Sequence, residues 1–512
     1  MTNKFRLWEN ILGWLTFAIA AVTYLMTIEP TTSLWDCGEF IASSFKLEVG
    51  HPPGAPFFMI LARFFANFAG GDVSKVAMMV NAMSGLASAL TIMFLFWTVT
   101  HLARRIFMKE EADFTAGKII AVLGAGLTGA LAYAFSDTFW FSAVEGEVYA
   151  TSSLFTAVVF WAILKWEDSA DKPHADRWII LIALMMGLSI GVHLLNLLAI
   201  PAIVFVYYFR KYEFSWKGFT LSIFLSLIIL VIIMYGIIPG IFRVTSSFEL
   251  FFVNVLGMPF NSGMYIHLLL LVTMLLLSVW YSFTHENARI TFLFSAATLL
   301  LSGLWILTGS AIMNFIFLAA VIYGSYWLAT NRKTVLNTVM TSLMVILIGY
   351  SSFATIVIRS VAETPMNEND PSNPFALLYY LNREQYGQRP LIYGPYYNAP
   401  VIDYTEGKPT YNPIDGKYKI TNRETVRKYD KRFMTLFPRM WSDQPDHMKV
   451  YEGYVGANGK PVQVKDPQSG ETSTLRCPTF GQNLGYMFGY QFGFMYFRYF
   501  MWNFSGRQND VQ

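Results

Sequence analysis

Charged side chains are scarce in this sequence. Asp, Glu, Lys and Arg make up only 14% of its 512 residues, whereas an average soluble domain carries about 25%. Hydrophobic residues account for 54% of the chain and aromatic residues for 17%. This composition excludes an ordinary soluble protein and is typical of a polytopic membrane protein. The formal net charge of +3 is too small to indicate a nucleic-acid-binding surface.

Cysteine is almost absent as well. The two cysteines, Cys37 and Cys477, exclude a disulfide scaffold and a structural zinc site. Two unpaired thiols are the favoured interpretation, and a single bridge between them is the alternative. The sequence also lacks the glycine-rich phosphate-binding loops and the H-E-x-x-H motif, so it gives no support to a nucleotide-driven pump.

Long apolar stretches recur along the first 358 residues. A helix needs about 20 apolar residues to cross a bilayer. We therefore expect about eleven transmembrane helices, near residues 11–28, 76–99, 117–135, 147–165, 178–192, 194–209, 218–239, 264–283, 290–308, 311–329 and 335–358. The stretch 178–209 is too long for one crossing. Two short helices in a hairpin are expected there, and one long kinked helix is the alternative.

The placement of Lys and Arg predicts the orientation. With a cytoplasmic N-terminus, most basic residues of the short connections lie on the cytoplasmic side, as the positive-inside rule requires. The connection 29–75 and everything after residue 358 then face outward, into the periplasm of a bacterium or the lumen of a eukaryote.

The composition changes after residue 358. Charged residues, Pro, Asn and Gly become common, and we predict a small soluble region of mixed α/β structure over 359–483. A helix is expected over 374–387, and short strands over 390–394 and 450–456. The aromatic segment 484–512 is predicted to be interfacial or re-entrant. Because no apolar helix closes this region, we expect the chain to be truncated or one piece of a longer protein.

The connection 29–75 carries the strongest candidate for chemistry. A helix over 33–46 would lie in the interface with its apolar face down and offer Asp36 and Glu39, three positions apart, to water. Ionisable groups held against a bilayer usually mark a functional site. One acid can act as general base while the other orients a substrate or binds a cation. The alternative is that Ser33 and Asp36 form a capping box.

Further candidates lie in the outward-facing segments. His51, in the rigid turn GHPPG, can donate to a phosphate or share a proton. Arg243 and Arg359 can pair with a lipid phosphate, although snorkelling to the interface is the alternative for each. Arg63 is a further candidate source of positive charge for a substrate phosphate. Glu145 and Glu147, with Asp137, fit a divalent-cation site, an acceptor groove or simple solvation. For His193 a structural role is favoured.

Two motifs in this region resemble a known family. The run WDCGEFI from Trp35 to Ile41, followed by GHPPG from Gly50 to Gly54, is similar to the core of the protein O-mannosyltransferase-like family of Bacteroidota, which has a vertebrate relative and belongs to the GT-C superfamily of membrane glycosyltransferases. The stretches GLSIGVHLLNLLAIP and FGYQFGFMYFRYFMWNFSGRQND also resemble family segments.

The resemblance implies a fold and an activity. It implies an all-α, GT-C-like transmembrane module over 1–358 in a bacterial inner membrane, with a cytoplasmic N-terminus and a periplasmic C-terminal region. It also implies inverting transfer of a sugar, mannose in this family, from a polyprenyl-phosphate donor to Ser or Thr of an acceptor protein. Asp36 is then the candidate catalytic base, and Glu39 assists it. No nucleotide cofactor is expected, and dependence on a divalent cation stays open.

Two other function classes remain at this point. A transporter or lipid flippase would need midplane polar residues and an internal repeat, which the sequence does not display. A non-catalytic subunit of a secretion or glycosylation complex would use the outer region to dock membrane partners.

Overall fold

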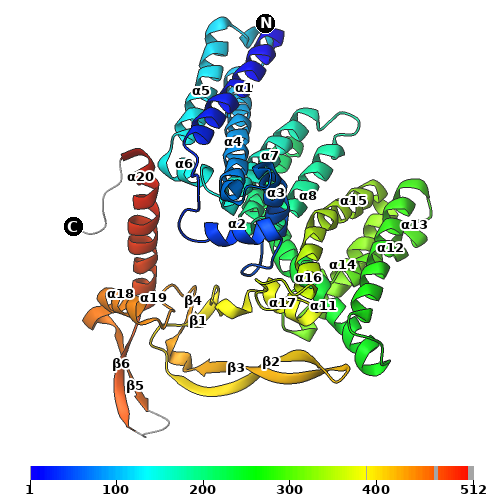
Figure 1. Ribbon diagram of the computed structural model, residues 1–512, viewed down its shortest axis with the longest axis vertical. Coiled ribbons are helices and arrows are strands. Elements are labelled where there is room, and N and C mark those ends of the chain that lie inside the picture. Colours follow the sequence, from blue (N-terminus) through cyan, green and yellow to red (C-terminus); the bar gives the residue numbers. More distant parts are fainter. Residues whose placement is uncertain (1, 388, 466–470, 506–512) are drawn as a thin grey trace. The chain divides into compact units, whose positions relative to one another are not determined.

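Two units make up the computed structural model of the protein, Met1–Arg383 and Glu384–Gln512 (Figure 1). The structure describes residues 2–387, 389–465 and 471–505. The end of the predicted aromatic segment, 506–512, lies outside the described residues.

The first unit is built from helices. Its α-helices are α1 (Thr2–Met26), α2 (Cys37–Lys46), α3 (Pro56–Ala66), α4 (Val76–Phe107), α5 (Ala116–Ala134), α6 (Asp137–Ala143), α7 (Val148–Ser169), α8 (Asp176–Ile190), α9 (Ile200–Lys211), α10 (Trp216–Val231), α11 (Ile238–Glu249), α12 (Ser262–Thr284), α13 (Ala288–Leu301), α14 (Ala311–Asn331), α15 (Lys333–Tyr350), α16 (Ala354–Val361) and α17 (Pro374–Leu381). Short 3-10 turns and two π-helical segments, Ile232–Ile237 and Leu250–Val255, connect or extend them.

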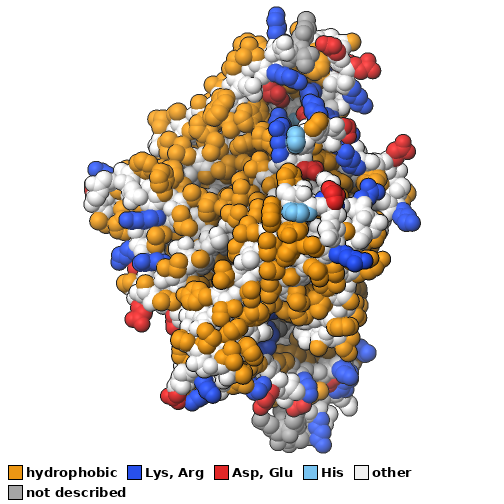
Figure 2. Space-filling view, turned by 90° about the vertical axis from the view of Figure 1, so that its right-hand side faces the viewer, with side chains coloured by type: hydrophobic (Ala, Val, Ile, Leu, Met, Phe, Trp, Pro, Cys, Tyr) orange, Lys and Arg blue, Asp and Glu red, His pale blue; other side chains and the backbone are white. Residues whose placement is uncertain are grey.

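Nine helical stretches in the described residues are long and apolar enough to cross a membrane. They confirm the prediction of a multi-pass helical membrane protein. Helices also occupy the two other predicted positions, but α8 has 15 residues and α13 has 14. At 1.5 Å per residue both are shorter than the hydrocarbon core, which is about 30 Å thick. Hydrophobic side chains dominate the face seen in Figure 2, as expected for a surface in contact with lipid.

The apolar stretch 178–209 is interrupted, as predicted. Helix α8 ends at Ile190, and a 3-10 turn over Leu194–Ala199 leads into α9. Helix α8 packs closely on α15, because a Cβ at Gly187 would lie 2.5 Å from the Ile346 carbonyl oxygen. This contact fixes the end of α8, which borders the site described below.

The described residues of the second unit contain three two-stranded antiparallel sheets. They pair β1 (Tyr393–Pro395) with β4 (Met434–Leu436), β2 (Val401–Ile414) with β3 (Lys417–Tyr429), and β5 (Lys460–Lys465) with β6 (Thr472–Cys477). Helix α18 (Pro445–Val455) covers 450–455, so the strand predicted over 450–456 is wrong. The helical segment from Phe480 to Ser505 contains α19 (Phe480–Gly485), a π-helical segment (Tyr486–Phe497) and α20 (Arg498–Ser505). The second unit thus contains both helices and strands, which confirms the predicted small α/β region.

Candidate functional site

The interfacial helix starts later than predicted. Helix α2 begins at Cys37 and lies across the end of the bundle formed by α1 and α4 (Figure 1). Trp35 has a φ of 66°, a left-handed conformation that cannot continue a helix, so the expected start at Ser33 is wrong. The Ser33 hydroxyl instead donates to the Glu145 carboxylate. Ser43, on the same helix, is buried.

Asp36 therefore does not form the capping box that the sequence allowed. It occupies the N-cap position of α2, but its side chain makes no capping hydrogen bond. Its side chain is exposed to solvent, while the next residue, Cys37, is fully buried. The carboxylate of Asp36 is thus available to a substrate.

Glu39 and His51 form a close pair. The Glu39 carboxylate accepts a hydrogen bond from the His51 backbone N–H at 2.7 Å and lies 2.8 Å from His51 Nδ1. The hydrogen bond that His51 makes to the Glu39 carboxylate raises the pKa of His51 against the opposing effect of burial. Burial alone would raise the pKa of Glu39, but its contacts with His51 lower it overall. Both shifts favour a carboxylate facing a protonated imidazole.

The turn that carries His51 is held from two sides. A Cβ at Gly50 would lie 2.5 Å from the nearer Glu39 carboxylate oxygen, so only glycine permits this approach. The Tyr380 hydroxyl on α17 donates to the Gly50 carbonyl oxygen at 2.7 Å. Val49, just before the turn, exchanges backbone hydrogen bonds with Met366 and Glu368. The turn is therefore fixed by segments more than 300 residues away in the chain.

Glu145 and Glu147 are buried acids between α6 and α7. Glu145 is 6% exposed and Glu147 is 5% exposed. Burial raises the pKa of both, and that of Glu147 reaches about 7, with added repulsion from Asp36 and Glu145. Glu147 also accepts a hydrogen bond from the Val148 N–H at 3.3 Å, at the start of α7. Near neutral pH, Glu147 can therefore hold or release a proton.

One cavity of about 250 Å³ collects several of these groups. Its walls are formed by the loop before α2, the first residues of α3 and α7, and the end of α8. The cavity therefore lies at one end of the bundle. Its polar lining consists of Asp36, His51, Glu147, Tyr149, His193 and Arg383. Two acids, two imidazoles and one guanidinium are thus brought into one small space.

Two predicted substrate-binding arginines do not line this cavity. Arg63 donates to the Phe45 carbonyl oxygen at 2.6 Å and lies over the Phe45 ring. Arg243 donates to the Ile306 carbonyl oxygen at 2.6 Å. The first contact places Arg63 at the C-terminal end of α2, where it satisfies a carbonyl group of the last turn.

Three polar residues of the cavity lining were not among the predicted site residues. Arg383 follows α17 in a left-handed conformation, with a φ of 55°. Tyr149 lies in the first turn of α7, and its ring centroid is 5.5 Å from that of His193. His193 accepts a hydrogen bond from the Leu195 N–H at 3.2 Å, a structural contact of the kind expected, yet it also faces the cavity. The early end of α17 at Leu381, before the predicted Gly387, is the feature that leaves Arg383 outside the helix.

Metal ligation and thiol pairing were also left open by the sequence. Across the residues that the structure describes, no three His, Cys, Asp or Glu side chains form a group able to hold a metal ion. Asp137 starts α6 and is not among the residues that line the cavity. Cys37 and Cys477 are free thiols, each buried within its own unit.

Comparisons with known proteins match two parts of the chain. Residues 36–216 match the family described as the protein O-mannosyl-transferase TMEM260 N-terminal domain. The match begins at Asp36 and covers α2 to α9. Residues 387–488 match a family of unknown function.

Two curated relatives carry the same family name. The chain is 27% identical over 233 residues to protein O-mannosyl-transferase TMEM260 of Mus musculus, which covers 45% of this chain and 30% of the relative. It is 26% identical over 147 residues to protein O-mannosyl-transferase tmem260 of Dictyostelium discoideum, which covers 29% of this chain and 16% of the relative. The matched segments thus span less than a third of either relative.

Proposed function

We propose that the protein is an integral membrane glycosyltransferase, because its N-terminal part is similar to an O-mannosyltransferase-like family and to two relatives of that name. It transfers a sugar, mannose, from a polyprenyl-phosphate donor to Ser or Thr hydroxyls of an acceptor protein. The observation that carries the proposal is the cavity in which Asp36, His51, Glu147 and Arg383 meet at the end of the helical bundle. A lipid-linked sugar reaches such a place from the bilayer, and a protein reaches it from water.

Asp36 is the proposed general base. Its carboxylate takes the proton of the acceptor hydroxyl as that oxygen attacks the anomeric carbon of the sugar. The bond between the anomeric carbon and the phosphate oxygen breaks, and polyprenyl phosphate leaves. A single displacement of this kind inverts the anomeric configuration. Asp36 lines the cavity, and its exposed side chain makes no capping hydrogen bond, which supports this role.

His51 and Arg383 are the proposed partners of the departing phosphate. Negative charge develops on the phosphate oxygens in the transition state, and fixed donors stabilise it there. Glu39 favours the protonated form of His51, so this side chain can offer positive charge. Arg383 adds a guanidinium, which matches the geometry of phosphate oxygens.

The other acids have supporting roles in this proposal. Glu39 orients His51 from outside the cavity. Glu147, with a pKa near 7, donates a hydrogen bond to a sugar hydroxyl while it is protonated. Glu145 holds the loop before α2 through Ser33. Arg63 stabilises the end of α2.

The proposed location is a bacterial inner membrane. Residues 1–358 form the membrane module, the N-terminus is cytoplasmic, and the C-terminal region is periplasmic, which agrees with the distribution of basic residues. A cysteine introduced by Asp72→Cys, in the 29–75 loop, should react with a membrane-impermeant maleimide in periplasm-accessible cells. Reaction only after the inner membrane is broken would reverse the orientation.

A transfer assay tests the proposed reaction. Membranes containing the protein are supplied with polyprenyl-phosphate mannose or with a nucleotide-linked mannose, together with a Ser- and Thr-containing peptide. We expect transfer from the lipid donor alone and a product linkage opposite to that of the donor. Transfer from the nucleotide sugar, or retention of configuration, would contradict the mechanism.

A further inference from the structure

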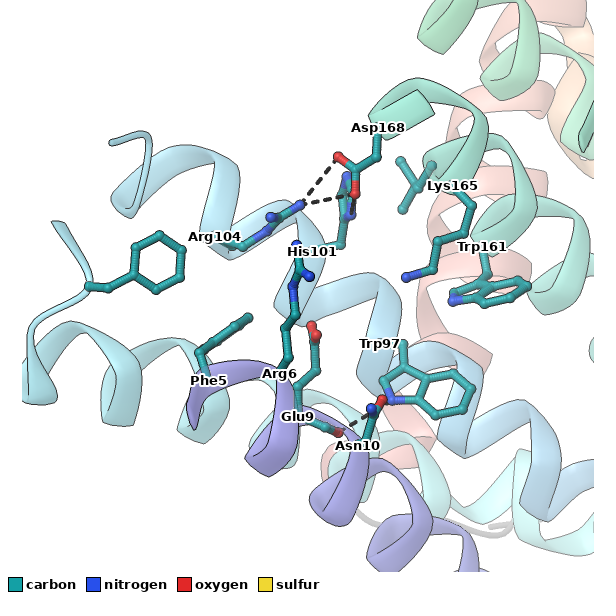
Figure 3. A pocket seen from close by; sticks show the side chains of 12 residues that line it. Phe5, Arg6, Glu9, Asn10, Trp97, His101, Arg104, Trp161, Lys165 and Asp168 are labelled. Atoms are coloured by element: carbon teal, nitrogen blue, oxygen red, sulfur yellow. Dashed lines mark hydrogen bonds and ion pairs between the residues drawn. The ribbon is translucent and has the colours of Figure 1, made fainter. Parts of the chain in front are cut away.

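A second cavity lies at the other end of the helical unit (Figure 3). The first turns of α1 and the last turns of α4 and α7 form its walls, and its volume is about 280 Å³. Helix α1 runs from Thr2 to Met26, so about 30 Å of helix separates Arg6 from the loop that carries Asp36. This cavity is therefore separate from the proposed catalytic site.

Several charges around this cavity already have partners. Arg104 donates to both carboxylate oxygens of Asp168, at 3.3 and 3.2 Å. His101 Nδ1 lies 3.7 Å from the same carboxylate. The Glu9 carboxylate accepts a hydrogen bond from the Thr100 hydroxyl at 2.9 Å. These contacts hold α1, α4 and α7 together and account for both acids that line the cavity.

Two cations are left without a carboxylate partner in the described part of the chain. Neither Arg6 nor Lys165 lies within 4.0 Å of a carboxylate oxygen of a described residue. In Figure 3, Arg6 extends from α1 and Lys165 extends from α7 toward the same open space. Two like charges that face one space repel each other, and an anion bound between them converts that repulsion into attraction.

Trp161 supplies a neutral donor beside these cations. Its indole N–H is buried and has no hydrogen-bond acceptor among the described residues. Buried donors are normally paired, so this orphan group indicates an absent acceptor. The Lys165 ammonium lies 5.3 Å from the centroid of the Trp161 ring, which holds it next to this N–H. Arg6, Lys165 and Trp161 together suit an anion with several oxygen atoms.

We propose that this cavity binds the phosphate of an anionic phospholipid headgroup. Guanidinium and ammonium groups are the preferred protein partners of phosphate. The cavity lies at the ends of three apolar helices that are candidate membrane spans, the level at which headgroups lie. Basic pockets between the ends of transmembrane helices are a recurring form of lipid recognition. The bound headgroup links α1 to α7 at the end opposite the catalytic site.

Lipid retention in native mass spectrometry tests this site. The protein is placed in nanodiscs of phosphatidylglycerol and phosphatidylcholine in equal amounts, and the lipids that stay bound are counted. We expect at least about tenfold preferential retention of phosphatidylglycerol, because each basic contact contributes roughly 1 kcal/mol near the surface. The double variant Arg6→Gln with Lys165→Gln should lose this preference.

A charge-matched control distinguishes lipid binding in this cavity from general attraction of anionic lipids to basic residues. Lys172 and Arg177 lie at the same end of the unit, between α7 and the start of α8, and do not line the cavity. Lys172→Gln with Arg177→Gln removes the same charge and should retain the lipid as the unchanged protein does. Equal loss in both double variants, or no loss in either, would overturn the proposal. If the Arg6 and Lys165 variant fails to elute as a folded species, Trp161→Phe replaces it and should reduce retention about threefold.

A comparison with inorganic phosphate shows whether the cavity binds a lipid headgroup or a soluble phosphate anion. When delipidated protein is studied in detergent, added phosphatidylglycerol should raise the melting temperature of the unchanged protein, whereas 10 mM inorganic phosphate should not. Stabilisation by phosphate alone would assign the cavity to a soluble anion and reject the lipid. Since neither readout measures sugar transfer, the result is independent of the proposed enzyme activity.

Discussion

At the scale of single residues, the chemistry depends on how neighbours set the charge of a few side chains. Glu39 holds His51 in a form that can carry positive charge, while burial lets Glu147 keep its proton near pH 7. Asp36 precedes them in the sequence, stays exposed and lines the same cavity as His51 and Glu147. The site thus combines an exposed carboxylate (Asp36), an imidazole whose protonated form is favoured (His51) and an acid that titrates near neutrality (Glu147).

Replacing Glu39 by Gln should move the alkaline limb of the pH–activity profile. The Glu39 carboxylate raises the pKa of His51, so its loss lowers that pKa, and the imidazolium is lost at lower pH. We expect transfer at pH 8 to fall about tenfold or more, with a smaller loss at pH 6. The measurement is kcat/KM against pH. Glu363→Gln, an exposed acid elsewhere in the unit, should leave the profile unchanged, and an unshifted alkaline limb in Glu39→Gln would refute the role of the pair.

Replacing Glu147 by Gln should change how stability depends on pH. The pKa of Glu147 is about 7 in the folded protein, against an ordinary value of 4.5. The folded state therefore holds a proton that the unfolded state releases between these values, so stability falls as pH rises from 4.5 to 7. The full effect is on the order of 3 kcal/mol. Melting temperatures should decline across this window in the unchanged protein and less in Glu147→Gln; parallel curves would contradict the burial argument.

The sequence predicted part of this site for identifiable reasons. Asp36, Glu39 and His51 lie within one short segment, so spacing and the membrane setting were enough to group them. Arg383 joins the cavity from more than 300 residues away, through α17 and its contact with the turn at Gly50. Such a contact depends on tertiary packing, which no local pattern records. The predicted substrate ligand Arg243 instead contacts the backbone of Ile306.

At the scale of elements, the boundaries matter more than the existence of each helix. The left-handed Trp35 delays α2 and changes Asp36 from a helical residue to the residue before the helix. The long hairpin β2–β3 turns at Asp415 and Gly416, both with positive φ. An Asp-Gly pair between alternating residues is a strong hairpin signal, so this element was predictable from the sequence. The helix at 445–455 was harder to predict from the sequence, because its aromatic and β-branched residues favour strands.

Replacing Gly50 by Ala should damage the turn that carries His51. The new methyl group would lie 2.5 Å from a Glu39 carboxylate oxygen, so the Glu39 side chain or the turn must shift, and the contact between Glu39 and His51 is disturbed. Overpacking of this kind costs about 1–3 kcal/mol. We expect a lower melting temperature and a loss of transfer. Gly38→Ala is the matched control, because a methyl group there meets no atom within 4 Å; equal behaviour of the two variants would show that the approach of Gly50 to Glu39 is not required.

At the scale of the whole molecule, composition was sufficient to predict the class of protein. Scarce charge and repeated apolar stretches indicate a multi-pass bundle, and nine described helical stretches meet the requirements for spanning. The short helices α8 and α13 show that the length of an apolar stretch can overestimate the number of membrane-spanning helices. One polar cavity of the helical unit lies beside the α2 loop, and another lies at the start of α1. We propose that the first acts on a lipid-linked sugar and that the second binds a lipid headgroup.

Transfer of mannose from polyprenyl phosphate to a peptide by the Asp36→Asn variant tests the account most directly. Asparagine keeps the size of the side chain but cannot accept the hydroxyl proton, so kcat should fall by about 10²–10⁴ while the melting temperature stays the same. Asp72→Asn removes one exposed carboxylate from the same connection and should transfer normally. An Asp36→Asn protein that transfers as fast as the Asp72→Asn protein would contradict the assignment of Asp36 as the base.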